Sequence, residues 1–197
     1  NITYTVGNYG FSLPTDNYRD SSISTPRIMI SVHYYDPWDF CGEESSNVTQ
    51  WGDTATNSSK TSSWGDESAL KSQFSSLYNK FVAAGYPVVI GEYGSIDKSA
   101  YDSTSAAQRA EFAKKVCTYA KKYGMVPVLW DNGYMGTYGF GVIDRSTCNR
   151  NTYDMHQHQS EADSKSCQIT CPLLRVGSTK HYQYKNESKY RFRNECL

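Results

Sequence analysis

Pro-Val-Val-Ile-Gly-Glu-Tyr-Gly, residues 87–94, is the stretch of sequence that decides the fold. The β-branched run at 88–90 has the length and composition of a strand that is buried on both faces. The run meets Gly91 and ends on an acid, Glu92. A carboxylate beside a buried strand is costly unless a partner or a function compensates. Glu92 is therefore either a structural acid held in an ion pair or a functional group.

Length and composition bound the class of protein. The chain has 197 residues and a formal net charge of +0, which predicts one domain with one hydrophobic core. The balanced charge gives no electrostatic reason to expect a nucleic acid or an acidic membrane surface as a partner. No apolar run approaches the ~20 residues that span a bilayer. We predict neither a nucleic-acid nor a membrane partner.

The amino-terminal end and the glycosylation triplets bear on localisation. Residues 1–4 have no basic start, no apolar signal core and no initiator Met, which predicts a processed or truncated start without a signal segment in this chain. Glycosylation triplets, together with 17 tyrosines, favour an extracellular protein, either secreted or on the cell surface. The triplets begin at Asn1, Asn47, Asn57 and Asn186.

Six cysteines are scattered along the chain, and their pairing is not readable from their spacing. Cys167 and Cys171 lie near His156 and His158, but this order and spacing fit no structural zinc pattern. Disulfide-bonded or unligated thiols are the alternative. We predict no metal and no cofactor.

Hydrophobic patterning predicts alternating strands and helices. Residues 1–26 and 38–66 have the composition of long loops, and the second contains three tryptophans. Strands are predicted at 27–35, 87–92 and 125–130, and helices at 68–84 and 105–123. Gly85 is expected to end the first helix, and Ser105 with Gln108 forms a capping-box pattern at the start of the second. Such alternation is typical of an α/β fold with a parallel sheet covered by helices.

Each predicted strand ends on residues that carry chemistry. His33 and Tyr35 end the first strand, Glu92 ends the second, and Trp130 with Asn132 follows the third. The carboxyl ends of parallel strands lie at one edge of a sheet, where barrel enzymes build their active sites. This shared placement favours a functional role for Glu92.

Three motifs carry a resemblance to a known family. Ser-Val-His-Tyr-Tyr-Asp-Pro (31–37), Val-Ile-Gly-Glu-Tyr-Gly (89–94) and Val-Leu-Trp-Asp-Asn-Gly (128–133) resemble the last three barrel strands of glycoside hydrolase family 5. The nearest types are its bacterial cellulases, lichenases and xyloglucanases, and the likeness covers roughly residues 13–150. The resemblance implies a partial (β/α)₈ TIM barrel of about the last three β/α units. Residues 1–152 would form this part of the catalytic barrel, followed by an atypical tail at 153–197.

The resemblance also implies a reaction and its residues. It implies retaining hydrolysis of β-1,4 or mixed β-1,3/1,4 glucans, an endoglucanase-like double displacement on a polysaccharide or oligosaccharide substrate. Glu92 matches the nucleophile, which attacks the anomeric carbon and forms a glycosyl-enzyme intermediate. His33 and Tyr35 match the positions whose hydrogen bonds keep this carboxylate ionised.

Substrate-binding residues follow from the same comparison of motifs. Trp130 matches the aromatic platform beneath the sugar, and Asn132 is expected to contact a hydroxyl group. The loop tryptophans are expected to line further subsites, although a tryptophan in a loop is as often a local anchor. They are Trp38, Trp51 and Trp64.

Two features depart from the family pattern. The family's general acid/base is a Glu after an Asn on the fourth strand, and no Asn-Glu-Pro occurs here. The predicted molecule is therefore a fragment that lacks the acid/base Glu, with little or no turnover by itself. Alternatives are a non-catalytic carbohydrate-binding remnant and an unfolded fragment. The atypical tail favours a shifted reading frame or an unrelated extension, because residues 152–165 show no apolar stripe and residues 166–197 are basic and contain cysteines.

Overall fold

The computed structural model describes residues 2–7, 9–17, 22, 24, 26–147 and 149–150. The atypical tail expected at 153–197, with Cys167 and Cys171, lies outside these residues, and so does the interpretation of its origin. No helix in the described ranges is long and apolar enough to cross a membrane.

A parallel three-stranded sheet forms the centre of the described chain, in the order β1-β2-β3. Its strands are β1 (Ile30–Tyr34), β2 (Val88–Tyr93) and β3 (Val126–Leu129). Ile30 pairs with Val88, and Val89 pairs with Val126, so that the β-branched run of β2 lies between its two neighbours. The predicted parallel sheet is confirmed, and β1 begins three residues later than expected, at Ile30 rather than residue 27.

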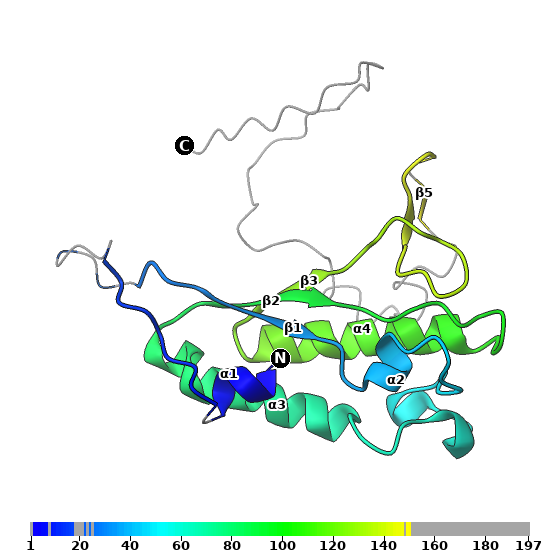
Figure 1. Cartoon of the computed structure of the whole chain (residues 1–197), viewed down its shortest axis with the longest axis horizontal. Coiled ribbons are helices and arrows are strands. Elements are labelled where there is room, and N and C mark those ends of the chain that lie inside the picture. The colour runs from blue at the N-terminus through cyan, green and yellow to red at the C-terminus, as the bar shows by residue number, and fades with distance from the viewer. Residues whose placement is uncertain are drawn as a thin grey trace, which may run out of the picture.

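Two long helices cover one face of this sheet (Figure 1). They are α3 (Glu67–Lys80) and α4 (Ser105–Lys122). Both helices bury the apolar stripe that their 3.6-residue periodicity predicts; the most buried members are Leu70, Phe74, Leu77, Phe112, Val116 and Ala120. The opposite face of the sheet is partly open, because Val126 and Val128 of β3 are exposed there.

The ends of the helices agree in part with the sequence prediction. The Asp66 side chain caps α3 by accepting a hydrogen bond from the Ala69 N–H at 2.9 Å. Gly85 has a φ of 86° and ends the short 3₁₀ helix η3 (Val82–Ala84) that continues α3, as a glycine in left-handed conformation can.

The capping box predicted for the second helix is wrong. Ser105 Oγ accepts a hydrogen bond from the Lys98 N–H at 3.1 Å, and Gln108 Oε1 accepts one from the Trp51 N–H at 2.8 Å. The N-cap position of α4 is Thr104, which makes no side-chain cap hydrogen bond. Both side chains bind the preceding loops because those loops pack against the start of α4.

The two predicted loops contain short helices. The first predicted loop contains α1 (Ile2–Val6), and the Ile2 side chain of this helix is buried in the core. The second contains α2 (Trp38–Cys41) and the 3₁₀ helices η1 (Gly52–Thr54) and η2 (Ser58–Lys60). A short antiparallel pair, β4 (Ile143–Asp144) with β5 (Asn149–Arg150), follows β3. Composition alone did not predict these elements, since each depends on packing or on a turn.

Asp102 fastens the loop between α2 and α3 to the start of α4. Its Oδ2 accepts hydrogen bonds from Thr49 Oγ1 at 2.7 Å, Gln50 Nε2 at 3.2 Å and Lys60 Nζ at 3.0 Å. Its Oδ1 accepts from the N–H and the hydroxyl of Thr104 at 2.9 and 2.7 Å. Burial disfavours the ionised carboxyl, but these donors outweigh burial and hold the pKa of Asp102 well below its usual range.

Replacing Asp102 by Asn should destabilise the fold in a pH-dependent way. At pH 7 we expect the free energy of unfolding to fall by about 2–3 kcal/mol, because buried donors lose a charged acceptor. The pKa of Asp102 is depressed in the folded state, so its contribution is complete above the unfolded value of about 3.9 and is lost as pH falls below it. The difference between wild type and Asp102→Asn should therefore shrink below about pH 4.

Urea unfolding at several pH values measures this difference. Glu44→Gln, at an exposed carboxyl group, is the matched control. A deficit of the Asp102→Asn variant that stays constant between pH 7 and pH 3 would contradict the assignment.

Candidate functional site

The parallel pairing of β1 and β2 brings His33 beside Glu92. The register runs regularly from Ile30 to Val32 and then shifts, so that His33 pairs with Glu92 and Gly91 is skipped. The shift places an imidazole and a carboxylate next to each other at the carboxyl end of the sheet. Both side chains are partly exposed, as groups that meet a ligand must be.

One oxygen of Glu92 makes both contacts of this carboxylate. The Tyr35 hydroxyl donates a hydrogen bond to Glu92 Oε2 at 3.1 Å, and His33 Nδ1 lies 3.3 Å from the same oxygen. Within the described part of the chain, Oε1 forms no hydrogen bond or ion pair. The arrangement fixes the carboxylate by one oxygen and leaves the other open to a ligand.

Tyr35 is held as a neutral hydrogen-bond donor. Burial, the hydrogen bond to Glu92 and the charge of Glu92 raise the pKa of Tyr35 above its usual value of 10.0. Its ring makes edge contacts with Trp38 and Phe140, at centroid distances of 6.3 and 5.9 Å. These contacts fix the direction of the phenol, so the hydrogen bond to Glu92 is preorganised.

Gly91 leaves room for the hydroxyl group of Ser31 on β1. A Cβ atom at this position would lie 2.7 Å from Ser31 Oγ and 3.6 Å from the His33 ring. The first distance is a collision, so a larger residue would require the Ser31 hydroxyl to move, whereas the distance to the His33 ring is an ordinary contact. The glycine before Glu92 is thus explained by the close approach of the Ser31 side chain.

Trp130 and its neighbours follow β3 at the same edge of the sheet. The Trp130 N–H donates to the Tyr93 carbonyl at 2.8 Å, and the Trp130 side chain is 43% exposed. Asn132 Oδ1 accepts from the N–H groups of Tyr134 and Phe140, at 3.0 and 3.2 Å. Asn132 therefore shapes the loop that carries Phe140, and only its amide nitrogen remains for the sugar contact expected from the sequence.

Asp131 has the structural role of a capping acid. Its carboxylate accepts hydrogen bonds from the N–H groups of Gly133, Val142 and Ile143. Its Oδ1 also lies 3.5 Å from Arg145 Nη2. Burial opposes ionisation of Asp131, but these backbone hydrogen bonds lower the pKa of the carboxyl group. Its bonds hold the loop after Trp130 in place.

The three loop tryptophans have different surroundings. Trp38 is 50% exposed, and its edge contact with Tyr35 places it beside the Glu92 site. Trp51 is only 3% exposed, its Nε1–H donates to the Gly65 carbonyl at 2.8 Å, and its ring packs on Phe112. Trp51 is therefore a local anchor, the alternative given for a loop tryptophan, because its ring is buried against Phe112.

Trp64 is 49% exposed but lies in another cavity. That cavity, of about 510 Å³, is lined by residues between Gln50 and Lys71 and by Tyr119. Its lining contains none of His33, Tyr35 and Glu92. The structure therefore does not bring Trp64 together with the residues around Glu92.

Phe140 is a site residue that the sequence did not indicate. Besides its contact with Tyr35, its ring lies against Gly94, where an added Cβ would come within 3.3 Å of it. It also lines a second cavity of about 230 Å³, together with Trp130 and the half-buried Arg109. Phe140 follows the last predicted strand by ten residues in an irregular loop, so no periodicity pointed to it.

Comparison with known proteins gives the family of this fold. A family model described as Cellulase (glycosyl hydrolase family 5) matches residues 5–136. Endoglucanase A of Paenibacillus barcinonensis is 63% identical over 147 residues, which cover 74% of this chain and 37% of the endoglucanase.

Solved structures agree with the family model. A family 5 xyloglucanase from Paenibacillus pabuli, determined in complex with a ligand, superposes with a TM-score of 0.75 at 60% identity. The superposed part covers 79% of this chain and 44% of the xyloglucanase chain. A broad specificity endoglucanase from Bacteroides salanitronis gives a TM-score of 0.65 at 34% identity, covering 79% and 39%. The chain thus spans less than half the length of these relatives.

The contacts at Glu92 make a prediction about Tyr35 itself. In Glu92→Gln the negative charge is removed and a neutral amide oxygen replaces the charged acceptor, so the pKa of Tyr35 should fall towards 10.0 while burial keeps it above that value. ¹³C NMR of tyrosine-labelled protein measures the titration, with Tyr35→Phe to assign the resonance. An unchanged Tyr35 titration in Glu92→Gln would mean that the two side chains do not interact.

Proposed function

The chain belongs to glycosyl hydrolase family 5, the cellulase family, and from this premise we propose that it is the carboxyl-terminal part of a retaining β-glucanase with Glu92 as its nucleophile. The observation that carries the proposal is the geometry of one carboxylate. Glu92 Oε2 is held by Tyr35 and lies beside His33, and Oε1 is open. A nucleophilic carboxylate needs this combination of a fixed orientation and one free oxygen.

The reaction would proceed by two displacements at the anomeric carbon. Glu92 Oε1 attacks this carbon, the bond to the leaving sugar oxygen breaks as that oxygen takes a proton from the acid/base carboxyl group, and a glycosyl ester forms on Glu92. Water then attacks the same carbon, gives its proton to the acid/base carboxylate, and releases Glu92 as a carboxylate. In both steps Tyr35 remains a neutral donor to Oε2, and it steadies the carboxylate as its charge is lost and regained.

The second carboxyl group of a retaining enzyme is proposed to come from outside the described residues. Retaining hydrolysis needs an acid/base carboxyl about 5–5.5 Å from the nucleophile. The contacts of Glu92 in the described ranges are a phenol and an imidazole, and neither is a carboxyl group. We assign the acid/base to an earlier strand of the barrel, since the chain covers 37% of the related endoglucanase.

We place the sheet among the last three β/α units of a (β/α)₈ barrel, with residues 1–152 as the barrel part. Parallel strands with helices on one face are the repeating unit of that barrel. The open face of the sheet carries Val126 and Val128, apolar side chains of the kind that fill a barrel interior. This orientation puts Glu92 at the carboxyl-terminal rim, where barrel enzymes have their active sites.

The substrate we propose is a β-linked glucan. Trp38 and Trp130 each expose about half of their surface at the rim that carries Glu92. The axial C–H face of a glucose unit packs on such a ring much as an apolar group does. The related proteins are named endoglucanase and xyloglucanase, which fits this substrate class. A polymeric substrate that cannot enter a cell supports an extracellular location.

A non-catalytic carbohydrate-binding fragment is the second candidate. The favouring observation is that the described residues bring one carboxylate, not two, to the site, while Trp38 and Trp130 still expose their rings. Such a fragment would bind glucan without turnover.

A substrate that needs no general acid distinguishes the two candidates. In 2,4-dinitrophenyl 2-deoxy-2-fluoro-β-cellobioside the dinitrophenolate leaves without a proton, and the fluorine slows hydrolysis of the ester. We expect intact-mass spectrometry to show one fluorocellobiosyl group per chain, located on the peptide that contains Glu92. Ordinary 4-nitrophenyl β-cellobioside should give little or no turnover, and Glu92→Gln should lower any turnover on the order of 10³-fold or more.

The control is Glu44→Gln, which should label like the wild type. Labelling of a carboxyl group other than Glu92 would overturn the assignment. Retention of the chain by β-glucan without any labelling would favour the binding fragment.

A further inference from the structure

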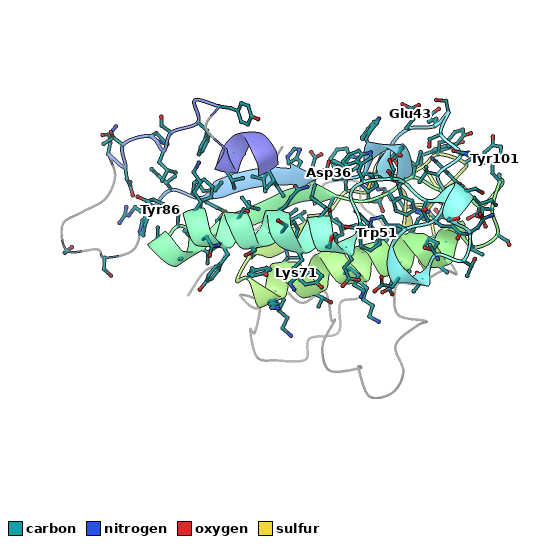
Figure 2. The ribbon with its side chains drawn as sticks, turned by 90° about the horizontal axis from the view of Figure 1, so that it is seen from below. Asp36, Glu43, Trp51, Lys71, Tyr86 and Tyr101 are labelled. Carbon is teal, nitrogen blue, oxygen red and sulfur yellow. The ribbon has the colours of Figure 1, made fainter. Side chains whose placement is uncertain are left out.

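The cavity that contains Trp64 lies on the helical side of the molecule. It is formed by the loop over residues 50–66, the first turns of α3 and Tyr119 of α4, and it measures about 510 Å³. Figure 2 views this side and labels Trp51 and Lys71, which both line the cavity. Its volume falls within the range of ligand-binding pockets, and the Glu92 site accounts for none of its residues.

The backbone that presents Trp64 is fixed on both sides. Before it, Gln50 Nε2 is bound to Asp102, and Gln50 Oε1 accepts from the N–H groups of Thr56 and Asn57 at 2.8 and 3.0 Å. After it, the Gly65 carbonyl accepts from the buried Trp51 Nε1–H, and Asp66 caps α3. An indole that is 49% exposed on an anchored loop keeps a large apolar surface in water. That cost is recovered when a ligand covers the ring.

Polar groups surround the ring of Trp64. Lys71 is exposed, and in the described part of the chain its ammonium group makes no hydrogen bond or ion pair. Asp53 is exposed on η1, and the Tyr119 hydroxyl donates to Glu67 at 2.7 Å within the same lining. Donors and acceptors of both signs thus lie around one aromatic face.

This chemistry fits an uncharged sugar better than an ion. A glucose unit offers a C–H face to the indole and hydroxyl groups that both donate and accept. Asp53, Asp66 and Glu67 disfavour a phosphate or another anion by repulsion. A bound cation is disfavoured because positive charge is already present. Lys71 lines the cavity, and Lys115 Nζ lies 2.7 Å from Glu67 Oε2.

We propose that this cavity, the Trp64 cavity, binds a β-glucan chain at a second site that is separate from the Glu92 site. The choice of glucan as the ligand rests on the function proposed above, whereas the cavity itself is an independent observation. Two sites on one chain raise the affinity for a long polymer, because binding at one site raises the effective concentration at the other. Short oligosaccharides occupy one site at a time and gain nothing from the second.

Retardation in native gels that contain soluble xyloglucan or hydroxyethyl cellulose tests the proposal. We expect Trp64→Ala to weaken retention of the full chain by about tenfold, the effect of losing one stacked aromatic side chain. The matched control is Tyr78→Ala, which removes an exposed aromatic ring that lies on α3 and outside the cavity. This variant should bind like the wild type. Trp64→Ala should leave covalent labelling of Glu92 unchanged.

Trp38→Ala separates this proposal from the proposed function. Loss of retention in Trp64→Ala with none in Trp38→Ala would support the Trp64 cavity and count against glucan binding at the Glu92 site. Loss in Trp38→Ala with wild-type retention in Trp64→Ala would overturn the Trp64 cavity alone. If Trp64→Ala fails to fold by circular dichroism, Lys71→Ala on the exposed face of α3 replaces it. Weaker retention of that variant supports the proposal, and unchanged retention overturns it.

Discussion

The carboxylate of Glu92 is held in one orientation by the parallel pairing of β1 and β2, and the candidate site depends on this contact. The skipped pairing at Gly91 brings His33 alongside, and the continuation of β1 brings the Tyr35 hydroxyl to the same oxygen. Because both partners belong to β1 or directly follow it, the site is as rigid as the pairing of two parallel strands. The other oxygen stays open to a ligand.

The loops beyond the strands hold the aromatic side chains of the rim. Lys98 is buried, and its ammonium group donates to the carbonyls of Asp39, Ser46 and Val48 at 2.9, 3.1 and 2.9 Å. These three bonds fold the segment after β1 around one cation and so position Trp38 beside Tyr35. Asp102 does the same for the segment that leads to Trp64. Buried charges with full sets of partners thus replace regular secondary structure in a part of the chain rich in Ser, Thr and Gly.

Sequence patterns predicted the sheet and its helices because these depend on local periodicity. The β-branched run of β2 and the apolar stripes of α3 and α4 required no knowledge of distant residues. Glu92 lies at a strand end, and the three predicted parallel strands end at one edge of the sheet. These two features were sufficient to suggest a site. The contacts of Glu92 with Tyr35 and His33 then followed from the parallel order of β1 and β2.

What the sequence could not predict depends on contacts between distant segments. Trp51 is buried against Phe112 whereas Trp64 lines an open cavity, and a pattern along the chain does not say which loop will pack on a helix end. Phe140 was missed for the same reason, since its role arises from contact with Tyr35.

The central claim is that Glu92 forms the covalent bond to the sugar, and a chimaeric enzyme tests it most directly. Residues of this chain that match Paenibacillus barcinonensis endoglucanase A would replace the corresponding part of that protein, which is 63% identical there. The initial rate of β-glucan hydrolysis would then be measured for the chimaera and for its Glu92→Gln variant. The account predicts hydrolysis by the first and none by the second, and hydrolysis at equal rates by both would contradict it.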